Sequence, residues 1–147
     1  MSSERGTDDP AELQEALRGF VRAFGLHQPE KTPCGQPIPV SEAHALGELA
    51  QDGELRQVEL ARRLRLTKST VSRLVGQLTA RGWVERAPAP GDGRGVVLRL
   101  TPSGERAAGN LAEARREKFS RLLVSIPEHE REGVLHALHV LVEALDE

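Results

Sequence analysis

The feature that most constrains this chain is a change in the spacing of its apolar residues near Gly82. Over residues 56–81 apolar side chains recur every three or four positions, as they do on amphipathic helices. Residues 83–100 instead contain two short runs rich in Val and Leu, which are typical of strands. The chain therefore has to place short helices directly before a small β structure.

The helical part is divided by a tight turn, Leu-Arg-Leu-Thr, into helices expected over 56–64 and 67–81. Strands are expected over 83–86 and 96–100, joined by a loop rich in Pro and Gly over 87–95. Two helices at a short turn followed by a β-hairpin predict a winged helix-turn-helix. The residues expected to face its core are Val58, Leu60, Ala61, Leu64, Val71, Leu74, Val75 and Leu78.

Further amphipathic patterns flank this unit on both sides. Helices are expected over 9–26, 41–51, 101–126 and 128–145, and the proline-rich segment 27–40 is expected to be an irregular linker. The predicted fold class is therefore mainly α, with a small β-hairpin wing. The first and last helices carry more apolar surface than one small winged domain can cover, which predicts a homodimer.

The net charge of −2 hides two unlike regions. Residues 54–102 hold ten Lys and Arg against four Asp and Glu, a net charge of +6, so the remainder of the chain carries −8. A basic block between acidic flanks is typical of a phosphate-binding unit, although charge alone also fits a solvated surface.

The outward face predicted for the helix over 67–81 has the side chains that DNA recognition needs. Hydroxyls at a helix N-terminus suit phosphate oxygens, an arginine can pair with guanine, and a glutamine can pair with adenine. The candidate DNA-binding residues on this helix are Lys68, Ser69, Thr70, Ser72, Arg73 and Gln77.

Four segments together resemble the MarR family of transcriptional regulators. They are Val-Glu-Leu-Ala-Arg-Arg-Leu from 58, Thr-Lys-Ser-Thr-Val-Ser-Arg-Leu-Val from 67, Leu-Thr-Ala-Arg-Gly-Trp-Val-Glu-Arg from 78, and Asp-Gly-Arg-Gly-Val-Val-Leu-Arg-Leu-Thr-Pro-Ser-Gly from 92. The resemblance implies that Arg94 enters the minor groove from the wing and that Asp92 holds it.

The same resemblance implies the organisation and the activity of the whole chain. It implies one MarR-like domain over 1–147, in which 41–102 form the winged helix-turn-helix while 11–40 and 103–147 supply dimerisation helices and a linker. It also implies a bacterial, dimeric repressor that binds a pseudo-palindromic operator in double-stranded DNA. An effector, which is a small molecule, a metal or an oxidant, would modulate its affinity.

The nature of that effector stays open at this level. His27, Cys34, Glu42 and His44 are four potential zinc ligands close together in the sequence, and they are the metal candidates. The alternative makes Ser41 a helix N-cap, Glu42 a partner of the helix dipole and His44 a packed or hydrogen-bonded residue. Cys34 alone is a candidate oxidant-sensing thiol.

Several other classes of protein are disfavoured. The sequence has no nucleophile elbow, phosphate loop or His-Glu-x-x-His motif, so an enzyme is not expected. The polar N-terminus and the lack of a long apolar run predict a cytoplasmic protein without a membrane segment, and a single cysteine excludes an intrachain disulfide. The alternative function is a winged-helix module that binds proteins and not DNA.

Overall fold

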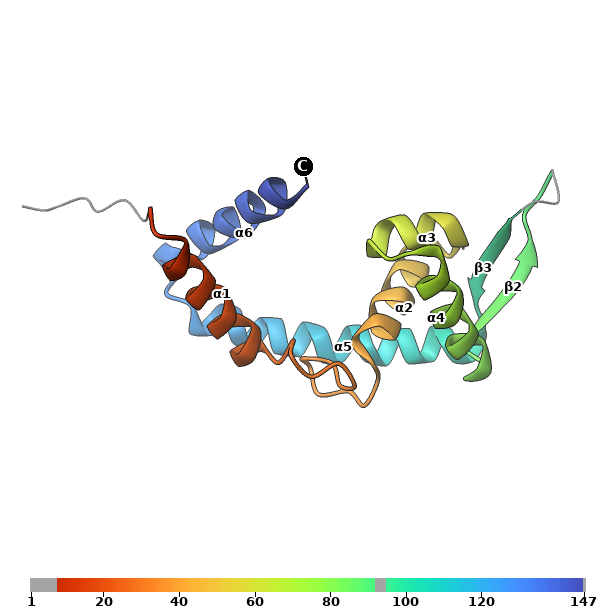
Figure 1. Cartoon of the computed structure of the whole chain (residues 1–147). Coiled ribbons are helices and arrows are strands. Elements are labelled where there is room, and N and C mark those ends of the chain that lie inside the picture. Colours follow the sequence, from red (N-terminus) through yellow and green to blue (C-terminus); the bar gives the residue numbers. More distant parts are fainter. Residues whose placement is uncertain (1–7, 92–94, 147) are drawn as a thin grey trace, which may run out of the picture.

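The computed structural model of this chain describes residues 8–91 and 95–146. It is mainly helical with one small sheet (Figure 1), which confirms the predicted fold class. No helix of this described part is long and apolar enough to cross a membrane. In chain order the elements are α1 (Pro10–Phe24), α2 (Val40–Asp52), β1 (Glu54–Arg56), α3 (Gln57–Leu64), α4 (Lys68–Ala80), β2 (Val84–Pro88), β3 (Val96–Leu100), α5 (Pro102–Ser125), the 3₁₀ turn η1 (Glu128–Glu130) and α6 (Arg131–Leu145).

Side-chain caps begin three of the six α-helices in the described part of the chain, α1, α4 and α5. Asp9 accepts a hydrogen bond from the Ala11 N–H at 3.0 Å and begins α1. Thr101 likewise accepts from the Gly104 N–H at 3.0 Å and begins α5. Each of these side chains satisfies an amide that the helix itself leaves unpaired. Each cap lies within three residues of its partner, which is why the sequence pattern predicts the starts of these helices to within one residue.

The prediction that Ser41 caps the second helix is wrong. Helix α2 begins one residue earlier, after Pro39, and has no side-chain cap. The Val40 N–H donates to the Pro29 carbonyl at 3.1 Å instead. The folded linker thus supplies an acceptor that no local pattern reveals, and the serine is not needed for this purpose.

The sheet contains one strand that the sequence analysis missed. The sequence pattern predicts a helix from residue 56 and no element over 54–55, but residues 54–56 form β1, which pairs antiparallel with β3 and places Leu55 opposite Leu98. The strand order is β1-β3-β2. A strand of three residues with a single buried side chain shows no recognisable alternation, so only its partner defines it.

The core lies where α2, α3, α4 and the sheet meet. The four core residues predicted for α4 are all buried there together with Leu46 and Leu49 of α2. The prediction that Val58 is buried is wrong, because its side chain is 59% exposed. Leu60, Ala61 and Leu64 turn one side of α3 to the core, and Val58 projects about 110° away from their centre at 100° per residue.

Helix α5 connects two parts of the molecule. Figure 1 shows its N-terminal half beneath the winged unit and its C-terminal half extending away toward α1 and α6. A Cβ at Gly104 would lie 2.0 Å from the Trp83 carbonyl oxygen, so only glycine allows α5 to start this close to β2. The long helix is thereby anchored to the base of the wing.

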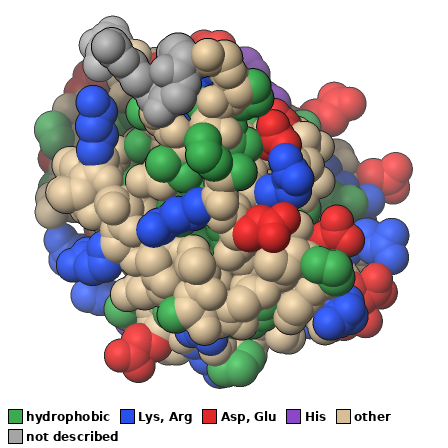
Figure 2. All heavy atoms as spheres, turned by 90° about the vertical axis from the view of Figure 1, so that its right-hand side faces the viewer, with side chains coloured by type: hydrophobic (Ala, Val, Ile, Leu, Met, Phe, Trp, Pro, Cys, Tyr) green, Lys and Arg blue, Asp and Glu red, His purple; other side chains and the backbone are tan. Residues whose placement is uncertain are grey.

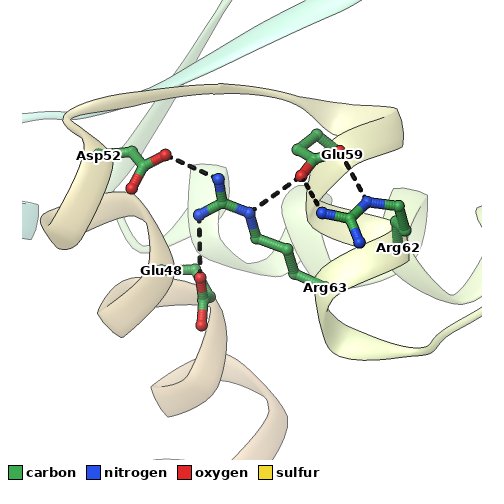
Figure 3. Close-up of polar contacts among 5 residues, drawn as sticks. All are labelled: Glu48, Asp52, Glu59, Arg62 and Arg63. Atoms are coloured by element: carbon green, nitrogen blue, oxygen red, sulfur yellow. Dashed lines mark hydrogen bonds and ion pairs between the residues drawn. The ribbon is translucent and has the colours of Figure 1, made fainter. Parts of the chain in front are cut away.

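Helices α2 and α3 are joined by an ion-pair network centred on Arg63 (Figure 3). Its guanidinium bonds Glu48 at 3.1 Å and Asp52 at 2.7 Å on α2, and Glu59 at 3.1 Å on α3. Glu59 also accepts from the Arg62 Nε at 3.0 Å. The hydrogen bond from Arg62 is the largest cause, and that from Arg63 the second, of a pKa of Glu59 lowered to about 2. In turn, the hydrogen bonds from Arg63 to Asp52, Glu59 and Glu48 raise the pKa of Arg63.

The network predicts a defined acid sensitivity. Because the pKa of Glu59 is lower in the folded state, its stabilising contribution is complete above the usual value of 4.5 and is lost as the pH falls toward about 2. Glu59→Gln should therefore reduce stability at pH 7, and the difference from wild type should shrink between pH 4.5 and 2. Urea denaturation at fixed protein concentration measures it. The matched control is Glu30→Gln, an exposed carboxylate in the linker; equal losses in the two variants would contradict the prediction.

Candidate nucleic-acid interface

The turn between α3 and α4 is short and well defined. Arg65 ends α3 in the left-handed conformation, with φ of 56°, and its N–H donates to the Arg62 carbonyl at 3.2 Å. Thr67 then caps α4 by accepting from the Thr70 N–H at 3.2 Å. The N-terminus of α4 is thus fixed relative to α3, as a helix-turn-helix requires.

Helix α4 presents the face that the sequence predicted. Its apolar stripe is buried, and five of the six candidate DNA-binding residues, all except Thr70, are exposed. Thr70 is half-buried, and its Oγ1 accepts a hydrogen bond from the Thr67 hydroxyl at 2.8 Å. The Thr70 hydroxyl keeps its own proton to donate, so it can still serve an acceptor such as a phosphate oxygen.

The charges on this face are available to a ligand. Within the described residues neither Lys68 nor Arg73 forms an ion pair, and α4 contains no acidic residue. Figure 2 looks at the winged end of the molecule: blue Lys and Arg side chains gather on the left with few red ones, whereas both signs mix on the right. A cationic surface of this kind attracts a polyanion.

Sequence reasoning missed one further cation beside α4. Arg86 on β2 donates from its Nη2 to the Ser72 carbonyl at 3.5 Å and lies against Gly76. Its partner across the hairpin is Leu98. Residues that pair directly across a hairpin share one face of the sheet, so the register places Arg86 on the same face as buried Leu98, the face that turns toward α4. This register was not assigned from the sequence, and Arg86 was therefore not found.

The wing is described only in part. Strands β2 and β3 pair from Val84 opposite Leu100 to Pro88 opposite Val96, and the Ala89 N–H donates to the Gly95 carbonyl at 3.2 Å. Asp92 and Arg94, the predicted wing contacts, lie outside the described residues. Their roles therefore remain predictions from the family resemblance.

The four metal candidates are not brought together. Across residues 8–91 and 95–146 no three His, Cys, Asp or Glu side chains lie close enough to hold one metal ion. Glu42 is buried and pairs with Arg81 at 2.7 Å, so its carboxylate is already occupied. Cys34 Sγ shares a hydrogen bond with the Thr32 hydroxyl at 3.0 Å, and His27 and His44 are exposed. Glu42 does lie in the first turn of α2, as its predicted dipole role requires.

A cavity lies between the linker, α1, α2 and α5, and we call it the linker cavity. It holds about 230 Å³. Apolar side chains supply most of its wall, among them Leu26, Val40 and Phe119, while Arg115 and Lys118 of α5 add two cations. Within the described residues neither cation pairs with a carboxylate. The cavity therefore suits a small apolar molecule that carries a negative charge.

Comparison with known proteins identifies this arrangement. Residues 36–95 match the MarR family. An HTH-type transcriptional regulator of Mycobacterium tuberculosis, MT0903.1, is 31% identical over 140 residues, which cover 95% of this chain and 97% of the relative. The chain belongs to the MarR family of transcriptional regulators.

Solved structures of MarR-like fold agree with this assignment. The S. aureus MepR–DNA complex superposes with a TM-score of 0.66 at 25% identity and covers 92% of this chain and 91% of MepR. NadR in complex with 4-hydroxyphenylacetate has a TM-score of 0.65 at 21% identity, covering 98% and 96%, and this likeness concerns the fold alone. The family resemblance, the DNA-binding regulatory function and the expectation of no enzyme are thereby confirmed.

This MarR-family regulator has large apolar faces outside its winged unit. The ring of Phe24 stacks on that of Phe20, with 5.4 Å between the ring centres. Its centre also lies 5.6 Å from that of the Phe119 ring, and this contact joins α1 to α5. No residue of α1 or α6 is fully buried. The exposed apolar side chains on α1, α5 and α6 are Leu13, Leu17, Phe20, Phe119, Leu122, Leu123, Val124, Val134, Leu135, Leu138, Val140, Val142 and Leu145. Family members act on operator DNA as dimers, and these faces are suited to be the interface.

The dimer prediction can be tested with one substitution on the exposed apolar face of α6. Leu138→Asp on α6 places a charge on an apolar face, so it should convert a dimer into a monomer in light scattering at micromolar concentration. Val58→Asp, at an exposed apolar position on the winged unit, is the control and should remain dimeric. A monomeric wild type, or a dimeric Leu138→Asp protein, would contradict the assignment of the interface.

Proposed function

We propose that this regulator is a dimeric repressor that reads a pseudo-palindromic operator by inserting α4 of each protomer into the major groove. Arg73 contacts a base edge, and Lys68, Ser69 and Thr70 hold phosphates. Ser72 and Gln77 complete the contact surface along the same face. The protein acts in the cytoplasm, where its DNA is.

The exposed, carboxylate-free outer face of α4 is the observation that carries this proposal. The side chain of Arg73 is exposed, and at 100° per residue it lies about 150° from the centre of the buried stripe of α4. A guanidinium presented this way can bond two acceptors of guanine at once. Hydroxyls in the first turn add the phosphate contacts that set the register of a recognition helix.

We assign the two activities to different parts of the chain. Residues 41–102 form the DNA-binding winged helix-turn-helix, while 11–40 and 103–147 supply the dimer helices and the linker. The shared core of α2, α3, α4 and the sheet supports the first unit. The exposed apolar faces of α1 and α6 support the second. Two winged units held by one dimer region would contact half-sites about one helical turn apart.

Base contacts and phosphate contacts predict different results. Arg73→Ala should weaken operator binding by about 1–3 kcal/mol and relax base choice at one position in each half-site. Lys68→Ala should weaken operator and random DNA by similar factors, because a phosphate carries no sequence information. Binding titrations on the regulator's own promoter region and on random DNA measure both effects. Arg116→Ala, an exposed arginine on α5, is the control. Equal losses from Arg73→Ala on both DNAs would refute its role as a base contact.

The wing contributes a second contact in this proposal. Arg94 enters the minor groove, supported by Asp92, and its positive charge is attracted by the strong negative potential of a narrow groove. Arg94→Ala should weaken operator binding, and the slope of log affinity against log salt concentration should fall in magnitude by about one. Light scattering should still show a dimer. Unchanged affinity and salt slope would show that the wing does not touch DNA.

The linker cavity is our candidate effector site. Its apolar wall would hold a hydrophobic ring, and Arg115 and Lys118 would hold a carboxylate by charge-assisted hydrogen bonds. We therefore propose that a small aromatic acid binds there and changes the affinity for DNA. The fold likeness to NadR, whose structure holds 4-hydroxyphenylacetate, supports the choice of a first probe.

Calorimetry can test this site directly. 4-Hydroxyphenylacetate should bind, and Arg115→Gln with Lys118→Gln should reduce the affinity about tenfold or more, since bonds to charged groups contribute about 1.5–3 kcal/mol. Arg121→Gln, one turn from Lys118 and outside the cavity wall, should leave it unchanged. If the neutral analogue 4-hydroxyphenylacetamide bound equally well, the two cations would not be the anion site.

A further inference from the structure

Glu42 is a buried carboxylate with a single cationic partner. It is 2% exposed, and its Oε1 and Oε2 accept from Arg81 Nε at 2.7 Å and Nη2 at 3.3 Å. A buried charge that loses its partner is strongly destabilising. The carboxylate and the guanidinium are therefore constrained to move together.

Arg81 lies at the junction of α4, β2 and α5. It is the C-cap of the recognition helix α4, and its guanidinium lies 4.9 Å from the centre of the Trp83 ring, just before β2. The Trp83 carbonyl accepts from the Thr101 N–H at 3.0 Å, at the start of α5. A displacement of Arg81 thus acts on the end of α4 and on the base of the wing at once.

The turn of α2 that carries Glu42 also forms part of the linker cavity. Val40, Ala43 and His44 line that cavity, whereas Glu42 between them points to Arg81. A molecule that enters the cavity and pushes this turn must also move the carboxylate. The first turn of α2 thereby contacts the linker cavity on one side and, through Glu42, the C-terminal end of α4 on the other.

From this geometry we infer that the Glu42–Arg81 ion pair is the positioning contact that transmits occupancy of the linker cavity to the recognition helix. The inference rests on the proposed effector site. Glu42 and Arg81 act through α4 and touch neither DNA nor effector. Without the pair, the cavity could still fill, but α4 and the wing would no longer respond.

Two residues of the chain, Cys34 and Trp83, make the inference testable without an identified effector. Cys34 lines the cavity and is the only cysteine, and Trp83 is the only tryptophan. Alkylation of Cys34 with N-ethylmaleimide places a bulky group in the cavity without any identified effector, and mass spectrometry verifies the adduct. Trp83 fluorescence then reports on the Arg81 junction, and titration with promoter DNA reports on function.

In the wild-type dimer the adduct should shift Trp83 emission and change operator affinity about tenfold, within the usual range of allosteric coupling. Glu42→Gln should form the adduct equally well and show neither response. Glu48→Gln is the matched control, because it weakens another ion pair of α2, to Arg63, which is not linked to α4. It should respond like wild type.

Each other outcome would overturn the inference. It falls if Cys34 does not react, if wild-type emission and affinity stay unchanged in the adduct, or if Glu42→Gln responds as fully as wild type. Hydrogen exchange needs no variant: in the wild-type adduct the Arg81 and Gly82 amides at the end of α4 must change protection. If the wild-type protein binds no promoter DNA, the proposed function is refuted and this inference is not. Trp83 fluorescence and hydrogen exchange then still test whether the linker cavity is coupled to the end of α4.

Discussion

The packing of α4 against α2, α3 and the sheet is the interaction on which the rest of the structure depends. Val71, Leu74, Val75 and Leu78 occupy one stripe and are all nearly or fully buried. Burying that stripe removes its apolar surface from water and, at 100° per residue, turns the hydrophilic side of the helix outward. The surface that meets DNA is therefore a direct consequence of how the core is packed.

The electrostatics divide the basic residues of the winged unit into two groups. Arg62 and Arg63 pair with carboxylates of α2 and α3, Arg81 pairs with Glu42, and Arg99 pairs with Glu54. Arg63, Arg81 and Arg99 join different elements, whereas the pair of Arg62 with Glu59 lies within α3. The surplus of +6 over residues 54–102 already subtracts Glu54 and Glu59, but Arg63 and Arg81 also pair with Glu48, Asp52 and Glu42, which lie outside that range. The surplus therefore overstates the charge offered to DNA.

Helix α2 contacts the linker cavity, α3 and the end of α4. One end contacts the linker cavity and Arg81, and the other end contacts α3 through Arg63. Its buried leucines, Leu46 and Leu49, join it to the core between these ends. A helix held at both ends and in the middle is suited to transmit a displacement as a rigid body, which is how packed cores amplify small shifts.

The sequence by itself determined the recognition helix, the turn before it and the hairpin after it. These features depend on residues within a few positions of one another, and their spacing records which side is buried. The family motif lies in the same segment, which is why the function could be predicted with the fold.

Only the tertiary structure decided the features whose partners are distant in the chain. Strand β1 exists because Leu55 meets Leu98, and α2 starts at Val40 because the Pro29 carbonyl is nearby. Glu42 was expected as a metal candidate or a dipole partner, yet it is held by Arg81. A carboxylate bonds whichever donor the fold brings within about 3 Å, and sequence spacing carries no record of that donor.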